Sequence, residues 1–394
     1  MAKILFTNTN CSINKGSAAQ VISTCETLRE TIPNLEITLM SRFPEIDLKL
    51  CKIHNINVVD KSWFPKLSEG IWSHMYYPYL HIFINMLFTG LFKIGLNPRY
   101  VNNPIVREYV SADAIIDLSG DCFSDGMGGF SIVIDSSILF GISLEKPIVM
   151  YSQSIGPFMR KVVFLAKYCL NRVDLIIIRE EITKRFLKEL EIESPIYLTA
   201  DCAFLLDSAP YDKVKEILLN EGIDLARKPL VGISANFMLD DDENNYANTM
   251  AQLTDYLSEK INAYVIFVPH VVSTKNGGMD DDRVIGEKIY KLAKNRTNMA
   301  LIKGDYSPEE LKGIIGLCDI FIGGRMHANI AAISKSVPTM ATAWSHKYYG
   351  IFQTIGQEKY VCDYKTMTLD ELKLSVDDLW KNRHEIHKEL NMKV

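Results

Sequence analysis

This sequence lacks a large excess of charge of either sign. Its 394 residues include 43 Lys and Arg against 48 Asp and Glu, which gives a net charge of −5. Binding of nucleic acid through the overall field requires a surplus of positive charge, so no nucleic-acid partner is expected. Hydrophobic residues make up 47% and charged residues 23%. These fractions are typical of globular proteins and exclude a disordered chain or a polytopic membrane protein.

Paired cysteines and metal-binding motifs are also missing. The eight cysteines are scattered without a C-x-x-C pair, so neither a zinc knuckle nor a secreted disulfide framework is indicated. The eight histidines show neither H-x-x-x-H nor H-E-x-x-H spacing, and we interpret the aspartates at 280–282 as a surface helix cap. We therefore expect no metal and no cofactor. The N-terminal apolar run is too short for a signal peptide, which favours a cytoplasmic location.

One long apolar and aromatic stretch, residues 71–96, needs separate treatment because Lys93 is its only Lys, Arg, Asp or Glu. Its length would admit a membrane span, but Pro78 and several polar residues within it oppose that interpretation. Two alternatives remain. The stretch forms a helix pair that covers the core, or an interfacial helix that makes peripheral contact with the inner face of the cytoplasmic membrane.

Short apolar runs of strand length alternate with segments of helical spacing along most of the chain. The expected strands cover residues 4–7, 37–40, 114–118, 148–151, 175–178 and 196–198, and then 230–234, 264–268, 300–302, 320–322 and 339–343. This order predicts an α/β protein with two doubly wound parallel sheets. We expect an N-terminal domain at 1–207, a C-terminal domain at 208–360, and a helical tail at 361–394 that packs back on the first domain. Such folds bind ligands at the carboxyl ends of their strands, in a cleft.

Polar turns follow several of these strands in the first half of the chain. The first turn, residues 8–17, opens a helix with Asn14, Gly16 and Ser17, whose free N–H groups suit an anion or a sugar hydroxyl. The alternative is an ordinary capped turn. The glycine-rich loop at 119–129 contains Asp121 and Asp125, which could accept hydrogen bonds from sugar hydroxyls or act as a base. The alternative there is a surface loop with aspartate caps.

Arginines follow two other strands. Arg179 comes directly after the strand at 175–178, where a guanidinium suits a carboxylate or a phosphate. It could instead anchor an ion pair with Glu180 or Asp201. In the second half, a strand, two glycines and a helix place Arg325 and His327 at a helix N-terminus, which favours a dianion. The alternative is that His327 caps its own helix and Arg325 forms a salt bridge.

The segment Gly324-Arg325-Met326-His327-Ala328, with the later Pro338 and Lys347, resembles the signature of the polysaccharide pyruvyl transferase family. Other segments support the resemblance in order along residues 3–363. They are the Asn-rich first turn with Gly16, the loop Gly120–Gly129, Gln153–Pro157, Arg179-Glu180 and Ala200-Asp201.

The resemblance implies two Rossmann-like domains of the GT-B glycosyltransferase type that face each other across a cleft. It also implies transfer of a pyruvyl group from phosphoenolpyruvate to two hydroxyls of a sugar, which forms a cyclic ketal and releases phosphate during capsule or exopolysaccharide biosynthesis. His327 would be the general acid that protonates C3 of the donor. Donor binding would involve Arg179, Arg325, Met326, His327 and Lys347. The acceptor side would involve Asn14, Gly16, Ser17, Asp121 and Asp125, and Asp121 and Arg325 would join His327 in catalysis.

The sequence departs from the family pattern at three places. Lys15-Gly16-Ser17 stands where Gly-Asp is common, Glu180 stands where Asp is usual, and Ser345-His346 precedes Lys347 where a tyrosine-containing version is commoner. These departures concern recognition of the acceptor, which could be a free sugar, a nucleotide-linked sugar or a sugar on a polyprenyl diphosphate.

Two other functions remain open. A sugar-nucleotide-dependent glycosyltransferase of the same architecture would need a carboxylate for the ribose hydroxyls, but Pro269-His270-Val271 follows the relevant strand. A non-catalytic sugar-binding protein is the third hypothesis, and the pairing of Arg325 with His327 argues against it.

Overall fold

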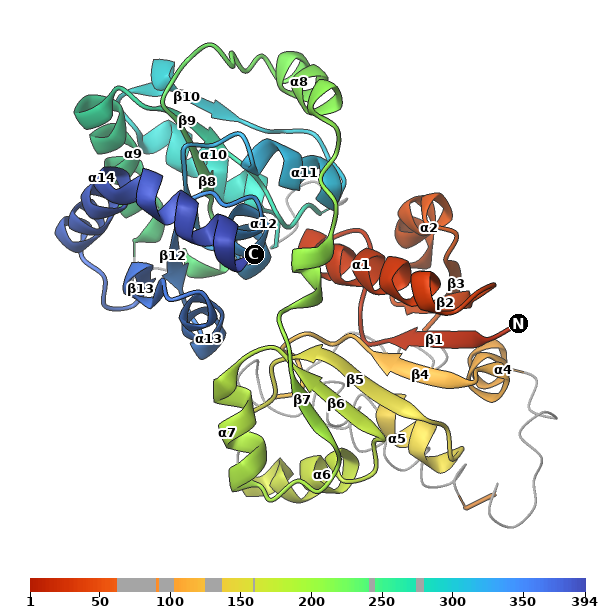
Figure 1. Cartoon of the computed structure of the whole chain (residues 1–394). Coiled ribbons are helices and arrows are strands. Elements are labelled where there is room, and N and C mark those ends of the chain that lie inside the picture. Colours follow the sequence, from red (N-terminus) through yellow and green to blue (C-terminus); the bar gives the residue numbers. More distant parts are fainter. Residues whose placement is uncertain (62–89, 92–102, 125–136, 159, 241–244, 274–279) are drawn as a thin grey trace, which may run out of the picture. The chain divides into compact units, whose positions relative to one another are not determined.

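The computed structural model describes residues 1–61, 90–91, 103–124, 137–158, 160–240, 245–273 and 280–394 (Figure 1). They form two compact units. Unit 1 comprises residues 1–12 and 20–202, and unit 2 comprises residues 13–19 and 203–394. Helix α1 (Lys15–Thr31) therefore begins in unit 2 and continues in unit 1. The division falls within the short helix η2 (Cys202–Leu205), a few residues before the boundary expected at 207.

Unit 1 is built on a seven-stranded sheet whose paired strands are all parallel, in the order β3-β2-β1-β4-β5-β6-β7. The strands are β1 (Lys3–Thr7), β2 (Glu36–Ser41), β3 (Asn57–Asp60), β4 (Ala114–Asp117), β5 (Ile148–Gln153), β6 (Leu175–Ile178) and β7 (Ile196–Leu198). The strand order reverses between β1 and β4. At such a switch point the turns diverge and leave room for a ligand at the carboxyl ends.

The alternation of side chains along β1 explains the two hydrophobic layers of unit 1. Ile4 and Phe6 pack in one core with Val21 of α1, whereas Leu5 points to the other core with Ile115. Successive strand residues face opposite sides of a sheet, so both faces need helical cover. Figure 1 shows α1 and α2 on one side, and α5 and α6 on the other. The α-helices bounded within the described part of unit 1, besides α1, are α2 (Pro44–Ile53), α4 (Pro104–Ser111), α5 (Ser137–Ser143), α6 (Arg160–Leu170) and α7 (Glu181–Glu189).

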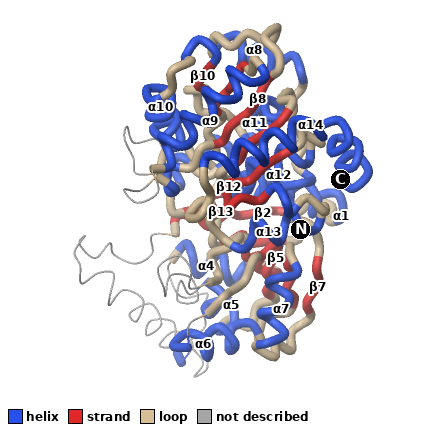
Figure 2. Tube along the Cα trace, turned by 90° about the vertical axis from the view of Figure 1, so that its left-hand side faces the viewer, coloured by secondary structure: helices blue, strands red, loops and turns tan. Residues whose placement is uncertain are grey.

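Unit 2 contains a six-stranded parallel sheet in the order β10-β9-β8-β11-β12-β13. Its strands are β8 (Leu230–Ser234), β9 (Tyr264–Phe267), β10 (Met299–Leu301), β11 (Ile320–Gly323), β12 (Thr339–Ala343) and β13 (Val361–Asp363). Its helices are α8 (Tyr211–Asn220), α9 (Tyr246–Ile261), α10 (Asp282–Leu292), α11 (Pro308–Ile315), α12 (Met326–Ser334), α13 (His346–Thr354) and α14 (Leu369–Lys393). The order reverses between β8 and β11, as in a Rossmann fold. In Figure 2 blue helices lie on either side of the red strands of unit 2.

The C-terminal tail belongs to unit 2 and packs on elements of that unit. Helix α14 contacts α9, β11 and β12, and Figure 1 shows it lying over these elements. Its buried residues recur at helical spacing and form one apolar stripe, namely Leu372, Val376, Leu379, Ile386 and Leu390. That stripe is covered by the helix's own unit. Strand β13 pairs with β12, so residues 361–363 also complete the second sheet.

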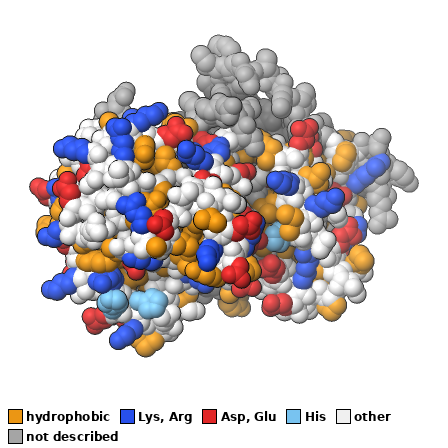
Figure 3. Space-filling view, turned by 90° about the horizontal axis from the view of Figure 1, so that it is seen from above, with side chains coloured by type: hydrophobic (Ala, Val, Ile, Leu, Met, Phe, Trp, Pro, Cys, Tyr) orange, Lys and Arg blue, Asp and Glu red, His pale blue; other side chains and the backbone are white. Residues whose placement is uncertain are grey.

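Two further expectations concern the surface. Residues 71–96 lie outside the described residues except for positions 90 and 91. Among the helices that are described, none combines the length and apolarity needed to cross a bilayer. On the face seen in Figure 3, acidic and basic side chains are interspersed, which agrees with the nearly balanced charge of the chain.

Candidate active site

The turn between β11 and α12 has no room for a side chain at Gly323 and little room for one at Gly324. A Cβ atom on Gly323 would stand 1.8 Å from Oδ1 of Asn329, and one on Gly324 would stand 3.0 Å from the hydroxyl of Tyr246. The backbone N–H of Gly324 donates to the carbonyl of Ser234 at 2.7 Å. The close approach of these segments fixes where α12 begins.

The structure places Arg325, Met326 and His327 where the sequence predicts, at the start of α12. Arg325 is the N-cap residue with an extended backbone, and Met326 is the first helical residue and is buried. The unsatisfied N–H groups and the dipole of a helix N-terminus stabilise negative charge. The arrangement can therefore receive an anion beside the Arg325 guanidinium.

Arg325 is held by a carboxylate that the sequence analysis assigned to a surface cap. Its Nε lies 3.1 and 3.2 Å from the two carboxylate oxygens of Asp282, and its Nη2 lies 2.7 Å from Oδ1. Asp280 makes a longer contact with Nη2 at 3.3 Å. These bonds use Nε and Nη2, so Nη1 faces neither aspartate. The guanidinium is thus oriented by a buried partner and retains a donor for a ligand.

Burial dominates the electrostatics of this pair. It raises the pKa of the Asp282 carboxyl above its usual range, and Arg325 and two backbone donors offset only part of that effect. Burial by itself lowers the pKa of Arg325, but Asp282 and Asp280 reverse this and the net shift is upward. Removing either side chain would leave the charge of the other one buried without the opposite charge closest to it.

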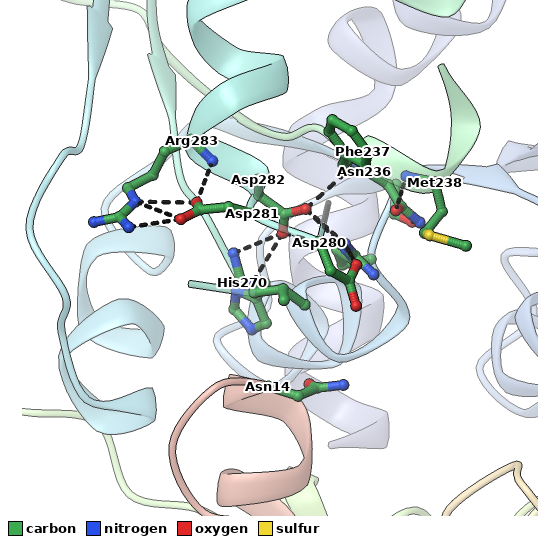
Figure 4. Close-up of polar contacts among 12 residues, drawn as sticks. Asn14, Asn236, Phe237, Met238, His270, Asp280, Asp281, Asp282 and Arg283 are labelled. Atoms are coloured by element: carbon green, nitrogen blue, oxygen red, sulfur yellow. Dashed lines mark hydrogen bonds and ion pairs between the residues drawn. The ribbon is translucent and has the colours of Figure 1, made fainter. Parts of the chain in front are cut away.

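The same carboxylate organises the loop after β9. Asp282 Oδ2 accepts hydrogen bonds from the backbone N–H of His270 at 3.0 Å and of Val271 at 2.8 Å (Figure 4). Its neighbour Asp281 is the N-cap of α10 and forms an ion pair with Arg283, with 2.6 Å between Oδ2 and Nη2. Of the predicted surface cap, the capping is confirmed for Asp281, which is nevertheless buried. The prediction is wrong for Asp282, which is buried and contacts Arg325.

His270 lies in this loop with its imidazole almost fully buried. Burial, and after it the charges of His327, Arg325 and Lys15 in that order, together lower its pKa to about 3. The imidazole is therefore neutral at physiological pH. Its Nδ1 is buried and has no hydrogen-bond partner within the described part of the chain.

The first turn of the chain packs on the same loop. Asn14 forms an antiparallel bridge with Val271, and the backbone N–H of Lys15 donates to the carbonyl of His270 at 2.9 Å. Asn14 Oδ1 accepts the N–H groups of Gly16 at 2.9 Å and of Ser17 at 3.4 Å. These N–H groups were predicted to meet a ligand. In the structure the Asn14 side chain caps the turn by accepting both of them.

Lys15 and Gly16 take specific positions in unit 2. The Lys15 side chain is buried and forms an ion pair with Asp305. Gly16 lies against the imidazole of His327, since a Cβ atom there would stand 2.3 Å from Nδ1. The first turn of α1 therefore forms part of the wall around His327.

Lys347 follows the neighbouring strand, β12, near the start of α13. Ser345 is the N-cap of this helix, and its Oγ accepts the backbone N–H of Lys347 at 3.4 Å. The Lys347 ammonium lies 4.4 Å from the ring centroid of Trp344, and the side chain is buried. The hydroxyl of Tyr348 donates to the carbonyl of Gly324 at 2.9 Å. This bond ties the start of α13 to the turn that carries Arg325.

Unit 1 has its own polar cluster at the carboxyl ends of its strands. Asp117, the last residue of β4, accepts hydrogen bonds from Asn8 at 2.5 Å, from the Ser119 hydroxyl at 2.6 Å and from Gln153 at 3.1 Å. Burial raises its pKa despite these donors. The network joins β1, β4 and β5 and supports the loop that begins at Ser119.

Arg179 lies in unit 1 as a buried ion-pair anchor. Its Nη1 lies 2.6 Å from Oδ2 of Asp201, and its Nε donates to the Ser154 hydroxyl at 2.8 Å. Burial by itself lowers the pKa of Arg179, whereas Asp201 and Asp121 raise it, and the net shift is upward. Of the two predicted alternatives for Arg179, the pair with Asp201 is what the structure shows. Its Nη2 is buried and has no partner among the residues described.

Three further acidic residues were considered in the sequence analysis, namely Asp121, Asp125 and Glu180. Asp121 lies close enough to Arg179 to affect its charge, whereas Asp125 lies outside the described residues. Glu180 does not pair with Arg179, since it caps α7 by accepting the N–H of Thr183 at 2.7 Å. Within the described ranges, no group of three His, Cys, Asp or Glu residues could hold a metal ion.

The sequence analysis missed His270, Asp282 and Lys15 as members of the site. His270 stands shortly after a correctly predicted strand, which is the position where parallel sheets present ligand-binding residues. That position could have identified His270 as a site residue from the sequence. Nothing in the sequence pattern identified Asp282, because an aspartate at the start of a helix is normally its cap.

Comparisons with known proteins agree with this architecture. The chain is 21% identical to the amylovoran biosynthesis protein AmsJ of Erwinia amylovora over 98% of its own length and 94% of that protein. The structure is similar to the UDP-GlcNAc 2-epimerase of Neisseria meningitidis, with a TM-score of 0.61, 9% identity and coverage of 99% and 93% of the two chains. It is also similar to HepE of Anabaena, with a TM-score of 0.57, 13% identity and coverage of 99% and 93%.

Likeness at such low identity shows the fold alone, which is two Rossmann-like units of the GT-B type. The family model of the polysaccharide pyruvyl transferases matches residues 14–346. That span contains the Gly324–Ala328 signature and runs from the first turn to the start of α13. The chain belongs to the polysaccharide pyruvyl transferase family.

Proposed function

We propose that this protein transfers the pyruvyl group of phosphoenolpyruvate to two hydroxyls of a saccharide during exopolysaccharide biosynthesis. The observation that carries the proposal is the Arg325 guanidinium, which Asp282 orients at the N-terminus of α12 beside His327. Membership of the family supports the same reaction. The similarity to AmsJ supports exopolysaccharide as the product.

Unit 2 would bind the donor. Phosphoenolpyruvate carries a carboxylate and a phosphate, and both suit an arginine and a helix N-terminus. Nη1 of Arg325 and the N–H groups of α12 would bind one anionic group, with Met326 shaping the wall. Lys347 would contribute the second positive charge from the start of α13. No cofactor is needed, because phosphoenolpyruvate is itself the activated donor.

The chemistry needs an acid and a base. His327 would deliver a proton to C3 of the enol, which becomes a methyl group and leaves positive charge on C2. One sugar hydroxyl would then attack C2 and lose its proton. The second hydroxyl would form the other C–O bond as the bond from C2 to phosphate breaks, and its proton would leave with the phosphate. Arg325 and Lys347 would stabilise the departing dianion.

Unit 1 would contribute to binding and deprotonation of the acceptor sugar. Asp121, which follows β4 and lies near Arg179, is our candidate for the base that removes the hydroxyl proton. Asn14, Gly16 and Ser17 would act on the acceptor only indirectly, since their polar groups build the first turn of α1. A polyprenyl-diphosphate-linked acceptor, with peripheral membrane contact through residues 71–96 at the inner face of the cytoplasmic membrane, is part of the proposal.

Calorimetric titration tests the proposal most directly. The protein and its Arg325→Ala variant would be titrated with phosphoenolpyruvate and with a panel of nucleotide-sugars. We expect saturable binding of phosphoenolpyruvate that the variant loses. Binding of a nucleotide-sugar without any binding of phosphoenolpyruvate would contradict the proposal and favour a sugar-nucleotide-dependent glycosyltransferase.

A further inference from the structure

His270 carries a buried polar atom that the fold itself does not use. The residue is 4% exposed, and its Nδ1 has no partner among the described residues. The loop is held through the main-chain groups of His270 and, as far as the structure describes the chain, not through its imidazole. The His270 N–H donates to the Asp282 carboxylate at 3.0 Å, and the His270 carbonyl accepts from the Lys15 N–H at 2.9 Å. Buried polar atoms in native proteins are normally satisfied, so an exception calls for a partner outside the chain.

The surroundings of His270 indicate what that partner is. Arg325 and His327 of α12 and Lys15 of α1 all act on the imidazole in the direction that keeps it uncharged. The nearby carboxylates of Asp282 and Asp305 are engaged with Arg325 and Lys15. A neutral imidazole has one N–H donor, whose position is set by what it meets. An anionic oxygen beside these positive groups would be met by a donor on Nδ1.

We propose that His270 is a further donor-binding residue, whose Nδ1–H hydrogen-bonds an anionic oxygen of phosphoenolpyruvate alongside Arg325. The inference rests on the proposed function and adds a residue to it. The carboxylate and the phosphate of the donor present the same chemistry to an N–H group. His270 acts by binding and orientation, and the proton for C3 comes from His327.

Two substitutions separate this role from a structural one. In His270→Asn the side-chain amide nitrogen comes near the position of Nδ1 and retains the donor. In His270→Leu the volume is roughly kept and the donor is lost. By calorimetry we expect His270→Leu to weaken phosphoenolpyruvate binding by about 10- to 100-fold, the usual effect of losing a hydrogen bond to a charged group. His270→Asn should stay within a few-fold of the wild type.

Thermal unfolding without ligand provides the second readout. Leucine leaves no polar atom unsatisfied, so His270→Leu should unfold at the wild-type temperature or above it. His387→Leu is the matched control, because His387 Nδ1 already has a partner in the carbonyl of Ser336 at 2.8 Å. Its affinity for phosphoenolpyruvate should be unchanged. Competition by inorganic phosphate and by pyruvate then shows which anionic group His270 binds.

The outcomes are distinguishable. Unchanged affinity of His270→Leu for phosphoenolpyruvate, phosphate and pyruvate would overturn the inference and leave the proposed function intact. Equal loss of binding in the Leu and Asn variants, together with a lower unfolding temperature in both, would show a structural role and also overturn it. Absence of phosphoenolpyruvate binding by the wild-type protein would instead remove the proposed function.

Discussion

The imidazole of His327 lies directly against Gly16, where a Cβ atom would stand 2.3 Å from Nδ1. The two residues are far apart in the sequence, yet the first turn of α1 limits where the His327 ring can lie. Any side chain at position 16 would push that ring away or displace the turn. Gly16 is therefore a positioning residue for the proposed general acid.

Gly16→Ala should lower kcat at least tenfold, because a displaced imidazole no longer reaches C3 of the donor. The affinity for phosphoenolpyruvate should change much less, since Arg325 and Lys347 are untouched. Steady-state kinetics would separate the two effects. Gly286→Ala in α10 is the control, because a Cβ there meets Leu301 at an ordinary 3.6 Å. Equal kinetics for Gly16→Ala and the control would contradict the positioning role.

Asp282→Ala should destabilise the protein by roughly 3 kcal/mol, because it leaves the Arg325 guanidinium buried without its counter-charge. It should also weaken phosphoenolpyruvate binding, since the guanidinium loses its orientation. Asp280→Ala is the comparison, because Asp280 is 61% exposed and contacts Arg325 at 3.3 Å. Its effect on stability should be below about 1 kcal/mol. Urea denaturation and calorimetry would check both, and similar losses in the two variants would argue against a special role for Asp282.

Arg179 can be tested by removing both members of its ion pair. Arg179→Met alone should cost roughly 3 kcal/mol because Asp201 is left buried and charged. Adding Asp201→Leu should recover most of the stability. We expect turnover to stay low in the double variant, because Nη2 of Arg179 is buried without a described partner and would be available to substrate. Recovery of both stability and turnover would limit Arg179 to the ion pair.

The depressed pKa of His270 predicts a pH dependence of stability. Between about pH 6.5, the usual value of a free histidine, and about pH 3, the unfolded chain binds a proton that the folded protein excludes. Stability due to this group is therefore complete above pH 6.5 and declines as the pH falls, by at most ~1.4 kcal/mol per pH unit. His270→Leu should show a shallower decline when urea midpoints are compared from pH 7 to pH 4.5. Parallel curves would contradict the buried neutral state.

The strands that sequence patterns predicted well are short runs of mainly apolar and β-branched residues between turns or polar residues. Four strands, Leu175–Ile178, Ile196–Leu198, Leu230–Ser234 and Thr339–Ala343, have the expected bounds. The edge strands β3 (Asn57–Asp60) and β13 (Val361–Asp363) were missed. Both carry exposed or half-buried residues and become strands only because a neighbouring strand offers hydrogen bonds.

The sequence alone determined the two parallel α/β units and the position of Arg325 and His327 at a helix N-terminus. Those features depend on local periodicity and on a continuous strand–glycine–helix segment. Only the tertiary structure decided that Asp282 orients Arg325 and that Gly16 packs against the His327 ring. It also decided that His270 lies near Arg325 and His327. These relationships arise because the strand order brings the loops after β9 and β11 and the first turn of α1 together. Contacts of that kind leave no periodic signal, since each partner is a single residue in a distant segment.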